Sequence, residues 1–172
     1  MRFICDSMLG DVARWLRLLG YDTLYSRNYE DWEILRIAQK DGRIILTRDV
    51  SLFRRARRKK LDAILVEHAP IEDVLAEIAF RSGIDLRFNA SRTRCPHCNV
   101  KLVSISKAEA LSLVKPEVAV KYDKFWLCPR CKRVYWQGNH WKTISTVLEK
   151  ANRKLLELRV RRGGRSRKPG GS

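Results

Sequence analysis

The chain of 172 residues has no long apolar run and relatively few acidic residues. Without an apolar stretch of about 20 residues we expect no membrane span and no secretory signal, and hence a cytoplasmic protein. Only 19 Asp and Glu face 36 Lys and Arg, which gives a formal net charge of +17. Such an excess predicts attraction to a polyanion, with nucleic acid the leading candidate. A basic surface without a specific partner is the alternative.

Two further features are missing. There is no strongly amphipathic basic helix with exposed Trp or Phe, which disfavours a protein of the membrane surface. No internal repeat is found beyond two similar cysteine motifs. The hydrophobic content of 45% is ordinary for a folded protein, and the length fits one full domain and a smaller one.

The sequence Cys-Pro-x-Cys occurs twice, at residues 95–98 (the first knuckle) and 128–131 (the second knuckle). Two cysteines separated by two residues can bind one ion, and four thiolates complete the tetrahedron of a closed zinc site. Disulfides, which need an oxidising compartment, and free thiols are the alternatives. We expect a structural zinc ion without a catalytic role, held by Cys95, Cys98, Cys128 and Cys131. The fifth cysteine, Cys5, lies in an apolar run and is expected in the core.

The first 90 residues alternate between short apolar strands and helical patterns. Strands are expected near residues 3–5, 21–25, 44–47 and 63–66, and helices near 8–19, 31–41, 51–60 and 70–81. The strand at 44–47 is apolar without alternation, which is typical of a strand covered on both faces. Strand and helix in alternation predict an α/β fold, a parallel sheet flanked by helices.

The second half predicts a smaller unit. Strands near residues 101–104, 125–127 and 134–136, with a short helix within 106–113, would form a zinc ribbon over residues 91–142. Apolar residues then recur at helical spacing and predict a terminal amphipathic helix over 143–160. Residues 161–172 are rich in Arg and Gly and predict a disordered basic tail. The first domain would therefore span residues 1–90.

Three aspartates are placed where the carboxyl ends of the predicted strands should meet. Asp6 directly follows the first strand, and Asp49 follows the third after Arg48. Asp31 begins the helix before that third strand and can reach the same edge from the side. Ligands bind at this edge in open parallel sheets, and oxygen-only ligands suit magnesium or manganese. Glu67, at the end of the fourth strand, is a possible fourth ligand.

A structural role for these aspartates is the alternative. Each one precedes or begins a predicted helix, and Asp is a favoured N-cap residue. Taken singly, each is more typical of a cap or a turn than of a metal ligand. Only their joint position at one edge favours a metal centre, in which bound ions would serve phosphodiester cleavage.

Basic residues surround this predicted edge and are expected to hold RNA. They are Arg14 and Arg17 on the first helix, Arg48 beside Asp49, and Arg54, Arg55, Arg57 and Arg58 on the helix after it. Trp15 is expected to pack in the core, with stacking on a base as the alternative. Most of the aromatic residues around the second knuckle should fill the ribbon core and leave one free to stack on a base; they are Trp126, Tyr135, Trp136 and Trp141.

Several segments resemble one known family, the Mut-seven C-terminal RNase family. They are residues 3–10, 13–23 and 46–49 in the first half and residues 94–99, 124–131 and 134–141 in the ribbon half. The resemblance covers residues 1–142 and implies a PIN-like nuclease fold followed by a zinc ribbon. It also implies that Asp6, Asp31 and Asp49 occupy the acidic metal-binding positions of PIN nucleases. The basic tail lies outside it.

The sequence thus predicts a ribonuclease that uses magnesium or manganese and acts on RNA, with ribosomal and transfer RNA as candidate partners. The alternative is an RNA- or ribosome-associated binding factor with little or no nuclease activity. A DNA-binding ribbon protein is a weaker option, because no recognition helix stands out.

Overall fold

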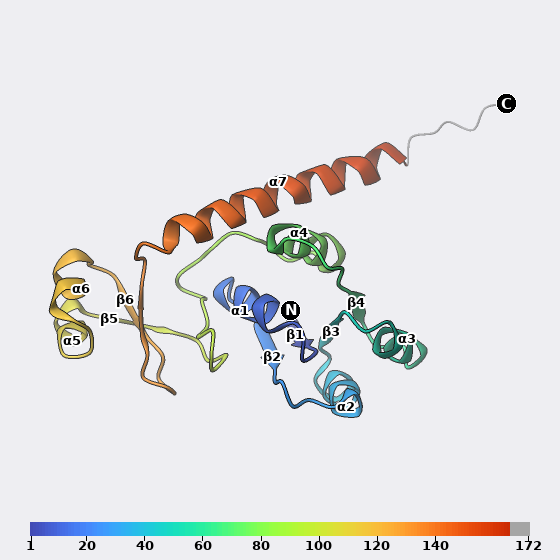
Figure 1. The fold of residues 1–172 in the computed structure, drawn as a ribbon, viewed down its shortest axis with the longest axis horizontal. Coiled ribbons are helices and arrows are strands. Elements are labelled where there is room, and N and C mark those ends of the chain that lie inside the picture. Colours follow the sequence, from blue (N-terminus) through green and yellow to red (C-terminus); the bar gives the residue numbers. More distant parts are fainter. Residues whose placement is uncertain (166–172) are drawn as a thin grey trace.

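The computed structural model describes residues 1–165 of the chain (Figure 1). Its first half is a parallel sheet in the order β2-β1-β3-β4. The strands are β1 (Arg2–Cys5), β2 (Asp22–Tyr25), β3 (Ile44–Thr47) and β4 (Ala63–Leu65). The helices that follow them are α1 (Gly10–Leu18), α2 (Asp31–Asp41), α3 (Val50–Arg58) and α4 (Ile71–Ser82). The predicted α/β class is confirmed.

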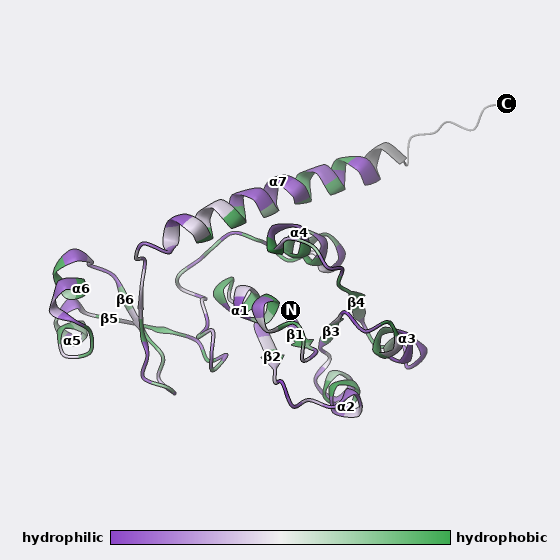
Figure 2. Cartoon of the chain, in the orientation of Figure 1, coloured by the Kyte–Doolittle hydropathy of each residue, from purple (hydrophilic) through white to green (hydrophobic). Residues whose placement is uncertain are grey.

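Helices cover both faces of the sheet, which is why its central strands β1 and β3 are buried over most of their length. Phe3 and Cys5 pack in one cluster with residues of α1 and α4, whereas Ile4 packs in another with residues of α2 and α3. Figure 1 shows these helix pairs on opposite sides of the strands, and Figure 2 shows apolar residues concentrated in the sheet and on the helix faces turned toward it. The prediction that Cys5 lies in the core is confirmed, since it is fully buried.

The strand order favours a ligand-binding crevice at one point of the sheet. The chain passes from β1 to β2 in one direction, and then from β2 past β1 to β3 in the other. The loops after β1 and β3 therefore lead to helices on opposite faces. A sheet of this kind opens a crevice between two such loops, at the carboxyl ends of the strands.

The second half is a small antiparallel sheet in the order β5-β6-β7. Its strands are β5 (Val103–Ile105), β6 (Phe125–Leu127) and β7 (Val134–Trp136). The second knuckle joins β6 to β7, and two short helices, α5 (Lys107–Leu111) and α6 (Pro116–Lys121), join β5 to β6. The sequence analysis missed α6, although Pro116 in its first turn is a helix-start signal.

The terminal helix α7 (Trp141–Arg165) runs along α4, against which it buries Leu148, Ala151 and Leu155 (Figure 1). The prediction of a disordered tail from residue 161 is wrong for residues 161–165, which continue the helix. Arginine is a good helix former, and cations near a helix C-terminus are favoured by the helix dipole. Residues 166–172 lie outside the described part. None of the helices within residues 1–165 is long and apolar enough to cross a membrane.

The segment that leads into the first knuckle is bonded to the end of α1. The Arg94 N–H donates to the carbonyl of Arg17 (2.9 Å), and the Thr93 hydroxyl donates to the carbonyl of Leu18 (3.0 Å). Gly20 ends α1 with φ +94°, and a Cβ there would lie 2.7 Å from the carbonyl oxygen of Arg92. The two halves of the chain therefore meet in a tight backbone contact.

We expect Gly20→Ala to lower the free energy of unfolding by about 2–4 kcal/mol, because it adds a steric clash to left-handed strain. Gly42→Ala is the matched control. Gly42 also has a positive φ (+61°), but nothing lies within 4 Å of a Cβ there, so a loss of about 1–2 kcal/mol is expected. Urea unfolding of both variants measures the difference. Equal losses would show that the contact with Arg92 contributes nothing.

Candidate functional site

Asp6 lies at the carboxyl end of β1, where the strand order favours a crevice between β1 and β3, and is 6% exposed. Its Oδ1 accepts a hydrogen bond from the Met8 N–H (2.9 Å). Its Oδ2 accepts hydrogen bonds from the Thr47 hydroxyl (2.5 Å) and the Arg48 N–H (2.9 Å). A buried carboxylate is tolerated when donors surround it in this way. Three donors thus hold the carboxylate in one orientation.

Thr47 connects Asp6 to Asp49. While its hydroxyl donates to Asp6, its oxygen accepts from the Asp49 N–H (2.9 Å). The Asp49 Oδ1 caps α3 by accepting from the N–H groups of Ser51 (2.6 Å) and Leu52 (3.3 Å). Among residues 1–165, no hydrogen bond to the Asp49 Oδ2 is found. Asp6 and Asp49 therefore share one edge, and Asp49 is also a helix cap.

Asp31 lies on α2 and pairs with Arg55 of α3. The structure does not gather it with the other two aspartates into a compact group. Within the described residues, the four cysteines are the one set of three or more metal-ligating side chains whose donor atoms all lie within 4.8 Å of each other. The charge of Asp31 is balanced by an arginine instead, a contact between two helices that the sequence pattern does not reveal.

Glu67 lies in the loop after β4 and is exposed. It lines a cavity of about 280 Å³ between β4, α4 and α7, together with Asp73, Glu77 and Lys154. Its carboxylate is not part of any compact group with Asp6 and Asp49. The structure therefore gives no support to Glu67 as a fourth ligand.

The predicted RNA-contacting arginines fall into three groups. Arg14 on α1 and Arg54, Arg57 and Arg58 on α3 are exposed. Arg48 and Arg55 are half-buried, and the Nε atom of each is buried without a hydrogen-bond partner in the part of the chain that the structure describes. Arg17 forms the third group and is buried.

Arg17 is buried and cannot make the predicted RNA contact. It is 5% exposed, and its guanidinium donates to the carbonyls of Thr23 (2.9 Å), Pro96 (2.6 Å) and His97 (3.4 Å). Burial lowers its pKa below the usual arginine value, although the nearby thiols oppose that shift. The prediction for Arg17 is therefore corrected: its guanidinium holds the first knuckle against α1 and β2. Arg14 and Arg17 are three residues apart, less than one helical turn, and the sequence analysis did not distinguish the buried arginine from the exposed one.

We expect Arg17→Met to lower the free energy of unfolding by about 2–4 kcal/mol, because buried carbonyls lose a charged donor. Arg14→Met, three residues earlier on the same helix but exposed, should change it by less than about 0.5 kcal/mol. Thermal unfolding of the pair checks this. Similar values for the two variants would contradict the assignment of Arg17 as the contact between knuckle and helix.

The four cysteines form a compact centre in which the two knuckles adopt the same backbone form. The Cys98 N–H points at the sulfur of Cys95 (3.4 Å), and the Cys131 N–H points at that of Cys128 (3.5 Å). The residues just after each knuckle, Asn99 and Lys132, both have φ +61°. All four Sγ atoms lie within 4.8 Å of one another. The arrangement fits a tetrahedral metal ion such as zinc.

The sequence analysis did not predict the roles of two residues beside this centre. The Tyr135 hydroxyl lies 3.1 Å from the sulfur of Cys95. The pKa of Tyr135 is raised, mainly because the side chain is buried and secondly because of this contact. The hydroxyl therefore keeps its proton and can donate it to the sulfur. Asn99 binds the edge of the larger sheet: it accepts from the Thr23 N–H (3.0 Å) and donates to Asp22 (2.7 Å). The only available signal was that Asn99 follows a knuckle, a position that favours a left-handed residue.

Comparison with protein-family models gives one match: the family described as the Mut7-C RNAse domain matches residues 1–148 of the chain. This range includes the aspartate edge and both knuckles. Comparison with curated proteins and with solved structures gives no match.

Proposed function

The chain belongs to the Mut7-C RNAse domain family, and from that premise we propose that it is a metal-dependent ribonuclease that hydrolyses RNA phosphodiester bonds. Membership itself points to a nuclease-like or RNA-related role. Hydrolysis, the use of a divalent cation and the residues that hold it are the proposal.

The observation that carries the proposal is the bonded chain Asp6–Thr47–Asp49 in the crevice between β1 and β3. The Thr47 hydroxyl donates to the Asp6 carboxylate and accepts from the backbone N–H of Asp49, so it ties together two segments more than 40 residues apart. A helix cap accounts for the Asp49 Oδ1, but it gives no role to the Asp49 Oδ2 or to the charge held in one orientation at Asp6. A site for a cation accounts for both.

The donor set fits magnesium or manganese. Mg²⁺ in proteins is commonly held by one or two carboxylates, with waters and substrate phosphate oxygens as its other ligands. Asp6 and Asp49 supply two carboxylates, and the Asp49 Oδ2 is free of hydrogen bonds from residues 1–165. Bound there, such a cation neutralises phosphate charge and lowers the pKa of an attacking water.

The residues around this edge would position the RNA. The half-buried Arg48 and Arg55 would contact phosphate oxygens through the accessible N–H groups of their guanidinium ends. The exposed Arg54, Arg57 and Arg58 would offset the charge of neighbouring phosphates. Asp31 would become a third ligand only if Arg55 released it, since the two side chains are paired in the structure. Arg55 is thus placed to exchange a carboxylate for a phosphate.

For the four-cysteine centre we propose Zn²⁺ in a structural role. Four thiolates close the coordination shell and leave no position for a substrate. The Tyr135 hydroxyl and the two knuckle N–H groups would stabilise the thiolates. This ion would hold the ribbon together and take no part in hydrolysis.

One observation favours the second candidate, an RNA-binding factor with little activity. The pair between Asp31 and Arg55 removes one of three expected acidic ligands from the edge. The basic surface serves binding as well as it serves catalysis.

End-labelled RNA of mixed single- and double-stranded structure, incubated with and without manganese, distinguishes the two functions. Cleavage that requires the metal supports the hydrolase. Tight binding that leaves every RNA intact in the presence of manganese would contradict it and support the binding factor.

A further inference from the structure

An open cavity of about 330 Å³ lies between α1, the ribbon and the start of α7. We call it the aromatic pocket; its ring-bearing residues are Trp15, Phe88, Trp126, Tyr135, Trp136 and Trp141. We propose that it binds an unpaired base of the RNA strand. This inference rests on the proposed function for the choice of RNA, and it adds a binding site separate from the aspartate edge.

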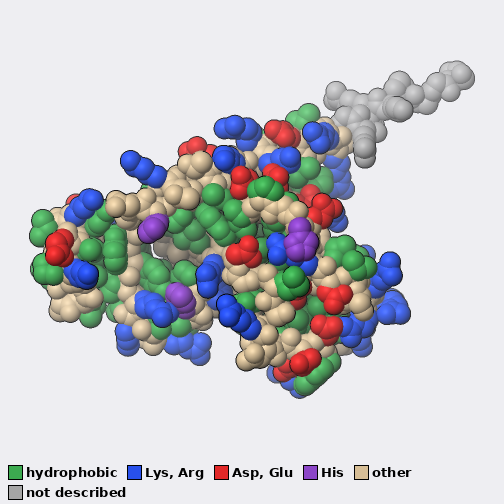
Figure 3. Space-filling model, in the orientation of Figure 1, with side chains coloured by type: hydrophobic (Ala, Val, Ile, Leu, Met, Phe, Trp, Pro, Cys, Tyr) green, Lys and Arg blue, Asp and Glu red, His purple; other side chains and the backbone are tan. Residues whose placement is uncertain are grey.

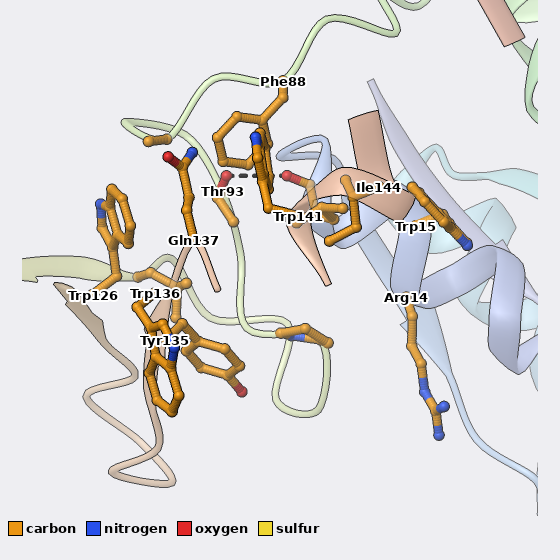
Figure 4. Close-up of a pocket in the computed structure, with 14 residues that line it drawn as sticks. Arg14, Trp15, Phe88, Thr93, Trp126, Tyr135, Trp136, Gln137, Trp141 and Ile144 are labelled. Atoms are coloured by element: carbon orange, nitrogen blue, oxygen red, sulfur yellow. Dashed lines mark hydrogen bonds between the residues drawn. The ribbon is translucent and has the colours of Figure 1, made fainter. Parts of the chain in front are cut away.

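Figure 4 shows how the rings surround the space. Trp126 and Tyr135 are cross-strand neighbours on β6 and β7. Trp141 packs edge-on against Phe88 at the start of α7, with ring centroids 4.5 Å apart. Trp15 faces this group from α1, on the opposite side of the space. Aromatic surfaces from both halves of the chain therefore converge on one cavity.

These rings do not form a closed core. Trp15, Trp126 and Trp141 are only half-buried and Trp136 is 37% exposed, whereas Phe125 is fully buried and fills the ribbon interior. Figure 3 shows the corresponding hollow between the two lobes, bordered by hydrophobic side chains. The sequence analysis expected at most one of these aromatic residues to be free. In the structure, several keep accessible faces, which is typical of a binding pocket.

The charge beside the pocket favours a nucleic acid over an apolar peptide. Arg14 lines it, is exposed, and extends its guanidinium away from the rings toward the open side (Figure 4). Arg133 directly precedes β7, whose Tyr135 and Trp136 line the pocket, and it is exposed. Base–aromatic stacking next to a cationic groove is how proteins bind single strands without sequence preference. A proline-rich peptide would use the rings but not these cations.

The pocket and the aspartate edge lie along one helix. α1 begins four residues after Asp6, and Trp15 follows five residues into it, about 8 Å along the helix axis. A strand whose base enters the pocket can therefore continue beside α1 to the crevice. The pocket would hold the substrate a short distance from the proposed point of cleavage.

The test compares two fluorescein-labelled strands by anisotropy: a single-stranded RNA and a strand of equal length with abasic sugars, which keeps the phosphates and loses the bases. The Asp49→Asn protein is used without added divalent cation and without chelator, so that neither cleavage nor loss of the cysteine-bound ion interferes. Trp126→Ala in this background should weaken binding of the base-bearing strand roughly 5- to 100-fold. Binding of the abasic strand should change little, and Trp126→Phe should restore most of the affinity.

Trp32→Ala is the matched control, because Trp32 is a 59% exposed tryptophan on α2, far along the chain from the ribbon. It should leave the difference between the two strands unchanged. If Trp126→Ala does not fold, as judged by circular dichroism and metal content, Trp136→Ala on the edge strand β7 serves instead.

Equal weakening of both strands, or no weakening, would overturn the proposal, as would a loss seen with Trp32→Ala alone. Competition by a proline-rich peptide but not by RNA would assign the pocket to a protein partner and also overturn it. The outcome is separable from that of the proposed function: selective base binding without any cleavage refutes the hydrolase alone. Cleavage with unchanged binding in Trp126→Ala refutes the pocket alone.

Discussion

Asp49→Asn is expected to lower the rate of manganese-dependent RNA cleavage roughly 10²- to 10³-fold, the loss of several kcal/mol of charge stabilisation at the reacting phosphate. The substitution should leave the other contacts of this residue in place. Asparagine is as good an N-cap as aspartate, so the Oδ1 contacts to Ser51 and Leu52 can persist. The substitution removes the negative charge of the side chain and replaces the free Oδ2 with an amide nitrogen. Single-turnover cleavage of end-labelled RNA, with thermal unfolding in parallel, measures the two effects separately.

Asp62→Asn is the matched control for Asp49→Asn. Asp62 is exposed and directly precedes β4, so it lies at the amino end of the sheet, opposite the proposed centre. Its substitution should leave cleavage unchanged. Asp31→Asn should cause a smaller loss than Asp49→Asn, because Arg55 already neutralises that carboxylate. If Asp49→Asn cleaves RNA as fast as the parent protein does, the edge between β1 and β3 is not the reactive centre.

The position of this edge was predictable because it depends on strand order and direction, which local patterns reveal. The unbroken apolar run at Ile44–Thr47 indicated a buried parallel strand, and parallel strands end at a common edge. Asp6 and Asp49 follow such strands directly, so their convergence was foreseen. The hydroxyl that joins them was not, because Thr47 reads simply as the last residue of a strand. Its role depends on which neighbour β3 takes in the sheet.

The features that the sequence analysis did not predict share a cause. Arg14 and Arg17 are chemically identical and three residues apart, and only the docking of the first knuckle decides that Arg17 is buried. Asp31 and Arg55 lie on different helices, so their pairing depends on how α2 and α3 pack. The aromatic pocket likewise requires the relative placement of α1, the ribbon and α7. Contacts between elements, unlike the elements themselves, leave no periodic signal in the sequence.

Removal of the zinc ion proposed for the four cysteines is the second change with a large expected effect. Structural zinc contributes on the order of 10 kcal/mol to small units of this kind. The three short strands of the ribbon, each of three residues, cannot compensate for such a loss. Cys128→Ser, or a strong chelator, should therefore unfold the ribbon. Tryptophan fluorescence reports this directly, since four of the five tryptophans line the aromatic pocket.

The effect should also reach the larger sheet, because the first knuckle is bonded to it. Asn99 binds both Thr23 and Asp22 on the edge strand β2, and Arg17 binds the Pro96 carbonyl. Loss of these partners should destabilise the α/β half by about 2–4 kcal/mol, so melting followed by circular dichroism should shift as a whole. Cys5→Ala is the control: it removes the one buried cysteine outside the centre and should retain the bound metal. If the chelator leaves the melting temperature of the α/β half unchanged, zinc binding and the stability of the larger sheet are independent. The contacts of the first knuckle would then contribute nothing to the stability of that sheet.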